Sequence, residues 1–232
     1  MIASHTQSLY KRLACSYDTI TNVLSYGQQG KIRREVVNKL QLEGNETVLD
    51  IGCGTGLNFG PLEEHLDPEG SIVGVDLSKE MLMQAQRRVL RKGWKNIELM
   101  RMDATRLKLR KKVDAVLCTF CLITIPRYDE ALKHALENLR PGGHFAAMDL
   151  KLSDNVFAYL ANLNIQWEAY IFGGDLRRKP WELLRQLENV DIKTKYLDTL
   201  IIYSGRKPQT NLLAKSNHFG VEGEKKYRED NE

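Results

Sequence analysis

The stretch VLDIGCGTGLNFG, from Val48 to Gly60, decides the fold of this chain. An apolar run ends in an acid and is followed by three glycines at every second position, Gly52, Gly54 and Gly56. Such a run predicts a buried strand, and the glycines predict a loop that lets another group approach the backbone before a helix begins. A glycine loop in this position is typical of nucleotide binding, and the spacing must decide which nucleotide.

Strands and helices are predicted to alternate on both sides of this loop. Strands are expected at 46–52, 70–78, 96–103, 113–123 and 144–150, and helices at 57–66, 78–92 and 127–140. Ser78 is a plausible N-cap, and the run Pro-Gly-Gly at 141–143 is the expected stop of the third helix. This alternation predicts an α/β fold with a doubly wound parallel sheet and helices on both faces.

The flanking segments have a different organisation. The first forty-odd residues read as helical with a break at 25–27, and 154–188 reads as helical with a break at Gly173-Gly174. The segments 190–198 and 199–207 read as two strands with a tight connection, which predicts an antiparallel pair closing the sheet. After residue 207 the chain becomes polar and loses periodicity, so 208–232 is expected to be a mobile tail.

The composition is that of one ordinary globular domain, and it gives no sign of a nucleic-acid partner, a membrane span, a secretory signal or a metal site. The 232 residues carry a formal net charge of +4, which demands no nucleic-acid partner. No stretch approaches a membrane span or a secretory signal core, so a cytoplasmic protein with reduced cysteines is expected. Cys118 and Cys121 form a C-x-x-C in an apolar run without a second pair, and the five histidines are scattered, so no metal site is expected.

The spacing of the glycines separates three kinds of nucleotide site. A phosphate-binding Walker loop needs a lysine after the glycines, and none is present. A dinucleotide loop needs a third glycine where Leu57 stands, and the Tyr-x-x-x-Lys pair of many oxidoreductases is also absent. S-adenosylmethionine, which has no phosphate, remains. Asp50, Asp76 and Asp103 end three successive strands, where acids can meet the ribose hydroxyls and the adenine of a ligand.

The motifs VLDIGCGTG, GVDLSKEML, MDATRL and LRPGG resemble those of class I S-adenosylmethionine-dependent methyltransferases. The resemblance implies a Rossmann-like, mostly parallel seven-stranded sheet whose last strand is antiparallel. It also implies one domain over 1–207, with an N-terminal helical lid at about 1–44, a cofactor-binding core at about 45–150, and an acceptor lid with the last strands at about 151–207. The implied cofactor residues are Tyr17, Asp50, Gly52, Cys53, Gly54, Gly56, Asp76, Leu77, Met81, Asp103, Ala104 and Thr119.

The acceptor is less well defined by the sequence. The segment 17–56 is similar to the entry segment of quinone-biosynthesis C-methyltransferases and bacterial phospholipid N-methyltransferases, in which a Tyr-Asp pair helps to cover the cofactor. The apolar segment after the fourth strand, including Phe120, suits a greasy acceptor, and no acceptor motif of nucleic-acid enzymes is present. The segment FGGDLRRKPWE resembles phospholipid N-methyltransferases and places Arg177, Arg178 and Lys179 between aromatic residues.

These features lead us to expect the amine of an aminophospholipid, such as phosphatidylethanolamine, as the acceptor. The basic triplet would hold its phosphate at the inner face of the membrane, and Tyr17 or Tyr26 would orient the amine. The alternatives are C-methylation of a quinone precursor, methylation of a small soluble amine or thiol, and a non-catalytic cofactor-binding subunit.

Overall fold

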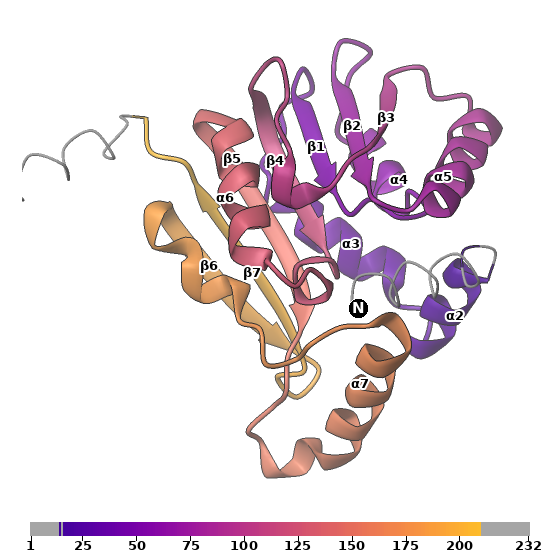
Figure 1. Cartoon of the computed structure of the whole chain (residues 1–232), viewed down its shortest axis with the longest axis vertical. Coiled ribbons are helices and arrows are strands. Elements are labelled where there is room, and N and C mark those ends of the chain that lie inside the picture. The colour runs from indigo at the N-terminus through magenta and orange to yellow at the C-terminus, as the bar shows by residue number, and fades with distance from the viewer. Residues whose placement is uncertain (1–13, 15, 210–232) are drawn as a thin grey trace, which may run out of the picture.

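The computed structural model describes residues 14 and 16–209, and its centre is a seven-stranded sheet (Figure 1). The strands are β1 Thr47–Ile51, β2 Ser71–Asp76, β3 Ile97–Arg101, β4 Val113–Thr119, β5 Leu139–Leu150, β6 Glu188–Lys195 and β7 Leu200–Arg206. The α-helices are α2 Tyr17–Leu24, α3 Gln29–Asn38, α4 Phe59–Glu63, α5 Lys79–Lys92, α6 Tyr128–Asn138 and α7 Tyr159–Phe172. Short 3₁₀ helices are η1 Ala104–Arg106, η2 Leu122–Thr124, η3 Val156–Ala158 and η4 Pro180–Gln186.

The strand order is β3-β2-β1-β4-β5-β7-β6. The first five strands pair in parallel, and β7 pairs antiparallel with both β5 and β6. The expected doubly wound sheet and its antiparallel closing pair are therefore confirmed. The chain order reverses between β1 and β4, and open α/β sheets bind their ligands beside such a reversal, at the carboxyl ends of the strands.

Alternate residues of the strands build two hydrophobic layers. On one face, residues such as Leu49 and Val116 pack with α6 and η4. On the other face, their neighbours Val48 and Ala115 pack with α3, α4 and α5. Figure 1 shows α6 in front of the sheet, whereas α2 and α7 lie together beyond the carboxyl ends of the strands. Both faces are thus buried, and the carboxyl-end edge is left for a site.

The ends of several elements differ from the sequence prediction. Strand β5 begins at Leu139 rather than His144, because Leu139 pairs with Val113 and the backbone of Gly142 and Gly143 exchanges hydrogen bonds with Lys207. The Pro-Gly-Gly run therefore lies inside a strand instead of in a loop. The segment 154–188 divides into η3, α7 and η4, and α7 ends at Gly173, which has a φ of 68°.

Three further expectations concern single features. Ser78 caps α5, because its hydroxyl accepts a hydrogen bond from the Met81 amide. Cys53, Cys118 and Cys121 are buried free thiols, in agreement with the expected reduced state of the cysteines. Within the described part of the chain, no helix is long and apolar enough to cross a membrane. The predicted tail lies almost wholly outside the described residues.

Candidate functional site

A cavity of about 430 Å³ lies at the carboxyl ends of the strands, next to the reversal of strand order between β1 and β4. Its wall comes from α2, from the loops after β1, β2, β3 and β4, and from the start of α5. Ten of the residues expected to bind cofactor or acceptor line it: Tyr17, Gly52, Gly54, Asp76, Leu77, Met81, Asp103, Ala104, Thr119 and Phe120. The structure thus brings together side chains that are more than one hundred residues apart in the sequence.

The three loop glycines have positive φ angles but different surroundings. A Cβ on Gly52 would lie 2.5 Å from Cβ of Cys121, and one on Gly56 would lie 2.5 Å from the ring of Phe59. A Cβ on Gly54 would meet nothing nearer than the Gly52 carbonyl oxygen, at 3.9 Å. Gly52 and Gly56 are therefore required by packing inside the protein. Of the two glycines that line the cavity, Gly52 and Gly54, only Gly54 has open space beside its Cα.

Two acids are held on the cavity wall by backbone amides. Asp76 accepts hydrogen bonds from the Gly54 amide at 2.9 Å and from the Ser78 amide at 2.8 Å. Asp103 accepts from the amide and the hydroxyl of Thr105, at 2.9 and 2.8 Å. Burial raises the pKa of Asp76, and the amide hydrogen bonds oppose that effect. Both carboxyl groups are fixed in orientation and keep free lone pairs for a ligand.

Asp50 does not reach the cavity, in contrast to the expectation from its position at a strand end. It lies fully buried beneath the loop, where it accepts a hydrogen bond from the Asn58 amide group at 2.8 Å. Burial raises its pKa to about 7. The side chain of Asn58 in turn contacts Arg33 and Thr119. Asp50 therefore supports the cavity wall from behind.

Arg33 is the centre of this buried network. Its guanidinium donates to Asn58 Oδ1 at 2.6 Å and to Thr119 Oγ1 at 2.8 Å, and it lies 5.6 Å from the ring centre of Phe120. Phe120 has a φ of 56°, a strained value for an aromatic residue. Arg33 thus ties α3 to the end of β4 and holds both Thr119 and Phe120 at the cavity.

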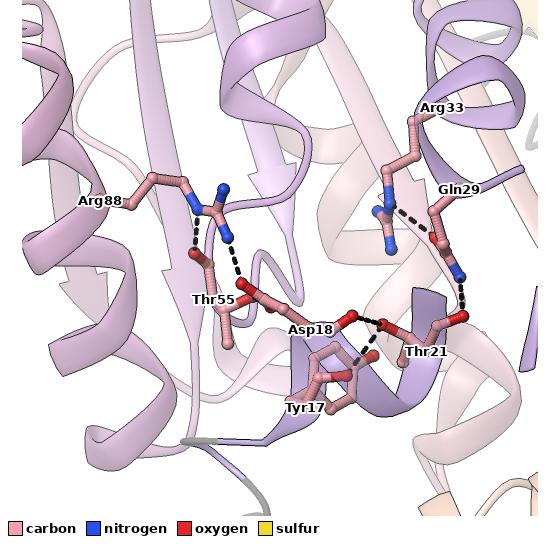
Figure 2. A network of polar contacts seen from close by, with 7 residues as sticks. All are labelled: Tyr17, Asp18, Thr21, Gln29, Arg33, Thr55 and Arg88. Atoms are coloured by element: carbon pink, nitrogen blue, oxygen red, sulfur yellow. Dashed lines mark hydrogen bonds and ion pairs between the residues drawn. The ribbon is translucent and has the colours of Figure 1, made fainter. Parts of the chain in front are cut away.

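Helix α2 covers the cavity and is attached by a second polar network, which Figure 2 shows. Asp18 accepts a hydrogen bond from the Thr55 hydroxyl at 2.5 Å and forms an ion pair with Arg88, whose Nε donates to the Thr55 carbonyl. On the preceding residue, the ring of Tyr17 packs edge-on against Phe172 of α7, with 5.3 Å between ring centres. Burial raises the pKa of Tyr17 to about 12, so its hydroxyl stays protonated.

A second, small cavity of about 30 Å³ lies between α2 and α7. It shares Tyr17, Phe120 and Thr124 with the larger cavity. Its wall also contains Glu168, the one acid among its described lining residues. Burial raises the pKa of Glu168 to about 7.

Other predicted site residues lie away from both cavities. Cys53 is buried against Gly74, and Tyr26 is 84% exposed at the turn after α2. The basic triplet is largely engaged by the protein itself. Arg177 forms an ion pair with Asp175, Arg178 donates to the Ile123 carbonyl, and Lys179 pairs with Glu182. Gly56 faces Phe59, as described above.

Some residues of the site were not predicted. Met102, Thr105, Ile125, Pro126 and Arg127 line the large cavity, and Glu168 lines the small one. Two features of the sequence could have indicated the roles of Arg33 and Glu168. Arg33 lies on the same helical stripe as Val36, Val37 and Leu40, where a charge is out of place. Glu168 is the single charged residue among the 14 residues of α7.

The sequence of this chain matches a known protein family and individual relatives. The model of the ubiE/COQ5 methyltransferase family matches residues 3–173. A demethylmenaquinone methyltransferase of Listeria monocytogenes is 30% identical over 142 residues, which are 61% of this chain and 60% of the relative. One of Lactobacillus johnsonii is 29% identical over 164 residues, 70% of this chain and 65% of the relative. The chain thus matches less than two thirds of the length of either relative.

Solved structures share the fold at lower identity. A methyltransferase of Aquifex aeolicus, described as dependent on S-adenosylmethionine, has a TM-score of 0.56 and 19% identity, over 75% of this chain and 88% of that one. A Haemonchus contortus N-methyltransferase, solved with phosphomonomethylethanolamine and S-adenosylhomocysteine, has a TM-score of 0.63 and 15% identity, over 77% of this chain and 53% of that one. Because the sequence identities are below 20%, these similarities establish the fold alone.

Proposed function

This chain belongs to the ubiE/COQ5 methyltransferase family, and on that premise we propose that it transfers a methyl group from S-adenosylmethionine to a ring carbon of a quinol-type acceptor. The observation that carries the proposal is the large cavity. Two amide-fixed acids and a glycine with open space beside it line its wall at the carboxyl ends of the strands. The relatives named as demethylmenaquinone methyltransferases favour the quinol-type acceptor.

The residues on the cavity wall fit S-adenosylmethionine. Asp76 can accept hydrogen bonds from both ribose hydroxyls, because its orientation is fixed by the Gly54 and Ser78 amides. Asp103 and Ala104 would lie near the adenine, and the open space at Gly54 would admit the methionine part. Tyr17 and Thr119 would close the site on the acceptor side. A lysine for a phosphate is absent from the glycine loop.

The bound cofactor supplies an electrophilic methyl group on a positively charged sulfur. Displacement at that methyl group disperses charge, so alignment and exclusion of water are the main tasks of the protein. Arg33 supports alignment by holding Thr119 and Phe120. Helix α2 would limit the entry of water on its side of the cavity, because the Asp18–Thr55–Arg88 contacts hold it against the glycine loop.

The aminophospholipid is the second candidate, and the structure gives it less support. Its phosphate would depend on the basic triplet, yet Arg177 and Lys179 pair with neighbouring acids and Arg178 donates to a backbone carbonyl. The cavity wall near the acceptor side is apolar, with Phe120, Ile125 and Pro126 among its residues. An aromatic ring suits such a wall better than a charged headgroup.

A transfer assay with labelled S-adenosylmethionine tests the proposal. Purified protein would be given a reduced demethylnaphthoquinone, phosphatidylethanolamine vesicles, and a soluble amine and thiol in parallel. We expect label in the quinol product. Label in the phospholipid alone would refute the quinol assignment, and calorimetry showing tighter binding of NAD than of S-adenosylmethionine would refute the cofactor.

A further inference from the structure

Glu168 is oriented against the polarity of its own helix. It is the single charged residue of α7 and it faces the small cavity beside Tyr17, while Leu160, Trp167 and Tyr170 are 60–79% exposed. A helix that served only to cover the core would place the acid outside and the aromatic residues inside. Its orientation therefore calls for an explanation in terms of the cavity.

The carboxyl group of Glu168 also lacks a structural partner. No hydrogen bond or ion pair joins it to another described residue, and desolvation is the cause of its raised pKa. The other polar side chains of this cavity are engaged. Thr21 donates to the Tyr17 carbonyl, and Gln29 accepts from Arg33 and donates to the Thr21 carbonyl. A partly buried carboxyl group that no neighbouring cation or donor stabilises is costly to the fold once it ionises, and such groups gather at functional sites.

We propose that the small cavity receives the hydroxyl group of the acceptor and that Glu168 takes the proton of that hydroxyl. This inference rests on the proposed function and names the acceptor subsite of the same reaction. The cavity adjoins the one that fits the cofactor, since Tyr17, Phe120 and Thr124 line both. A hydroxyl bound there would place the attached ring against Phe120, next to the methyl donor.

The size of the cavity agrees with a hydroxyl group and excludes a ring. A volume of about 30 Å³ holds one water-sized group. The ring of an aromatic acceptor would therefore lie on the side of the larger cavity, with only its hydroxyl group in the small one. Few residues of α7 are buried, namely Ile165, Ala169 and Phe172, and the helix ends in Gly173-Gly174. These features make α7 the element that can open the subsite.

The proton balance of the step is complete. The hydroxyl O–H bond breaks, the proton moves to the Glu168 carboxylate, and the electron pair is delocalised to the ring carbon. That carbon forms the new bond to the methyl group as the methyl–sulfur bond breaks. The ring carbon then loses its hydrogen to water as a proton, and Glu168 returns its proton to the oxygen. The net result is one methyl group transferred and one proton released.

Few charged groups influence the protonation of the Glu168 carboxyl group. The titratable side chains among the described residues that line the small cavity are Glu168 of α7 and Tyr17 of α2. Tyr17 stays neutral below a pH of about 12. From α3, the charged group of Arg33 contacts Gln29 of the cavity wall. The segment after β4 and the end of β5 contribute Phe120, Ile123, Thr124 and Leu150, which carry no charge.

Binding of 1-naphthol, a hydroxyl-bearing ring that cannot be oxidised to a quinone without added oxygen, tests the inference without turnover. Calorimetry on the full chain with S-adenosylhomocysteine would compare the wild type, Glu168→Gln and the control Glu182→Gln, whose side chain is 58% exposed. With a pKa of about 7, the carboxyl group is about one-tenth ionised at pH 6 and nine-tenths at pH 8. We expect the affinity for 1-naphthol to rise up to about tenfold from pH 6 to pH 8 in the wild type and in the control. In Glu168→Gln the affinity should not change with pH.

The outcomes separate this inference from the proposed function. In the transfer assay, Glu168→Gln should lower kcat about 10²–10⁴-fold without changing cofactor affinity, and Glu168→Asp should restore part of it. Equal naphthol binding by all three proteins at both pH values would overturn the inference, even if quinols are methylated. The expected naphthol binding by a wild type that methylates no quinol would refute the proposed function and support the subsite. Tighter pH-dependent binding of hexylamine than of naphthol would overturn the hydroxyl assignment.

Discussion

The three loop glycines should respond very differently to alanine, although the sequence presents them as equivalent. All three have positive φ, between 56° and 79°, so alanine costs each about 1–2 kcal/mol of backbone strain. At Gly56 the new Cβ would also lie 2.5 and 2.6 Å from two ring atoms of Phe59. Forcing an extra methyl group into such a site costs a further 1–3 kcal/mol or so. At Gly54 there is no such contact.

The expected changes in the free energy of unfolding follow from these distances. Gly56→Ala should lose about 2–5 kcal/mol and Gly54→Ala about 1–2 kcal/mol. For a domain of this size, each kcal/mol lowers Tm by roughly 2–4 °C. Gly60→Ala is the matched control, since Gly60 lies in α4 with nothing within 4 Å of its added Cβ. That change should leave stability equal or raise it by up to about 1 kcal/mol.

Cofactor affinity should show the opposite order. Gly54 borders the cavity, so its added methyl group would take space from the ligand and weaken S-adenosylmethionine binding at least tenfold. Urea unfolding followed by circular dichroism gives the stabilities, and calorimetry gives the affinities. A Gly54→Ala variant that is destabilised as much as Gly56→Ala, or that folds and binds the cofactor like the wild type, would contradict these expectations.

Four further outcomes are expected. Asp76→Ala should weaken S-adenosylmethionine binding by about 1.5–3 kcal/mol, roughly ten- to over a hundredfold, and unchanged affinity in calorimetry would show that another residue holds the ribose. Arg33→Met should lower unfolding free energy by about 3–5 kcal/mol, because it leaves a buried polar network without its cation; urea unfolding at wild-type concentrations would contradict this. Glu168 has a folded pKa near 7 against an ordinary 4.5, so the folded state holds its proton between those values and stability falls as pH rises from about 4.5 to 7. Glu168→Gln should therefore be more stable than the wild type at pH 8 by up to about 3 kcal/mol, and equally stable near pH 4, as read from unfolding at both pH values. Finally, Arg177→Gln combined with Lys179→Gln should change the KM for a quinol less than twofold, and a large increase would restore the basic triplet to the acceptor site.

Short-range patterns in the sequence were sufficient for the fold and for half of the site. Alternating strands and helices predict the parallel sheet, since each pattern depends on residues only two to four positions apart. In a parallel sheet the carboxyl ends of the strands share one edge. The acids Asp76 and Asp103 at strand ends therefore had to lie near one another, and both line the cavity. The same rule failed for Asp50, because the loop after β1 folds over its side chain and buries it.

The tertiary structure alone decided which polar groups meet across the chain. Arg33 bonds to Thr119, 86 positions later, and Tyr17 packs against Phe172. No local pattern encodes such pairs, because they depend on how helices settle on the sheet edge. Packing also showed that neighbouring side chains by themselves require glycine at positions 52 and 56. The folded structure also pairs the basic triplet with groups of the protein itself, and it turns Glu168 toward the small cavity. The choice of acceptor chemistry therefore depends on contacts that form only after folding.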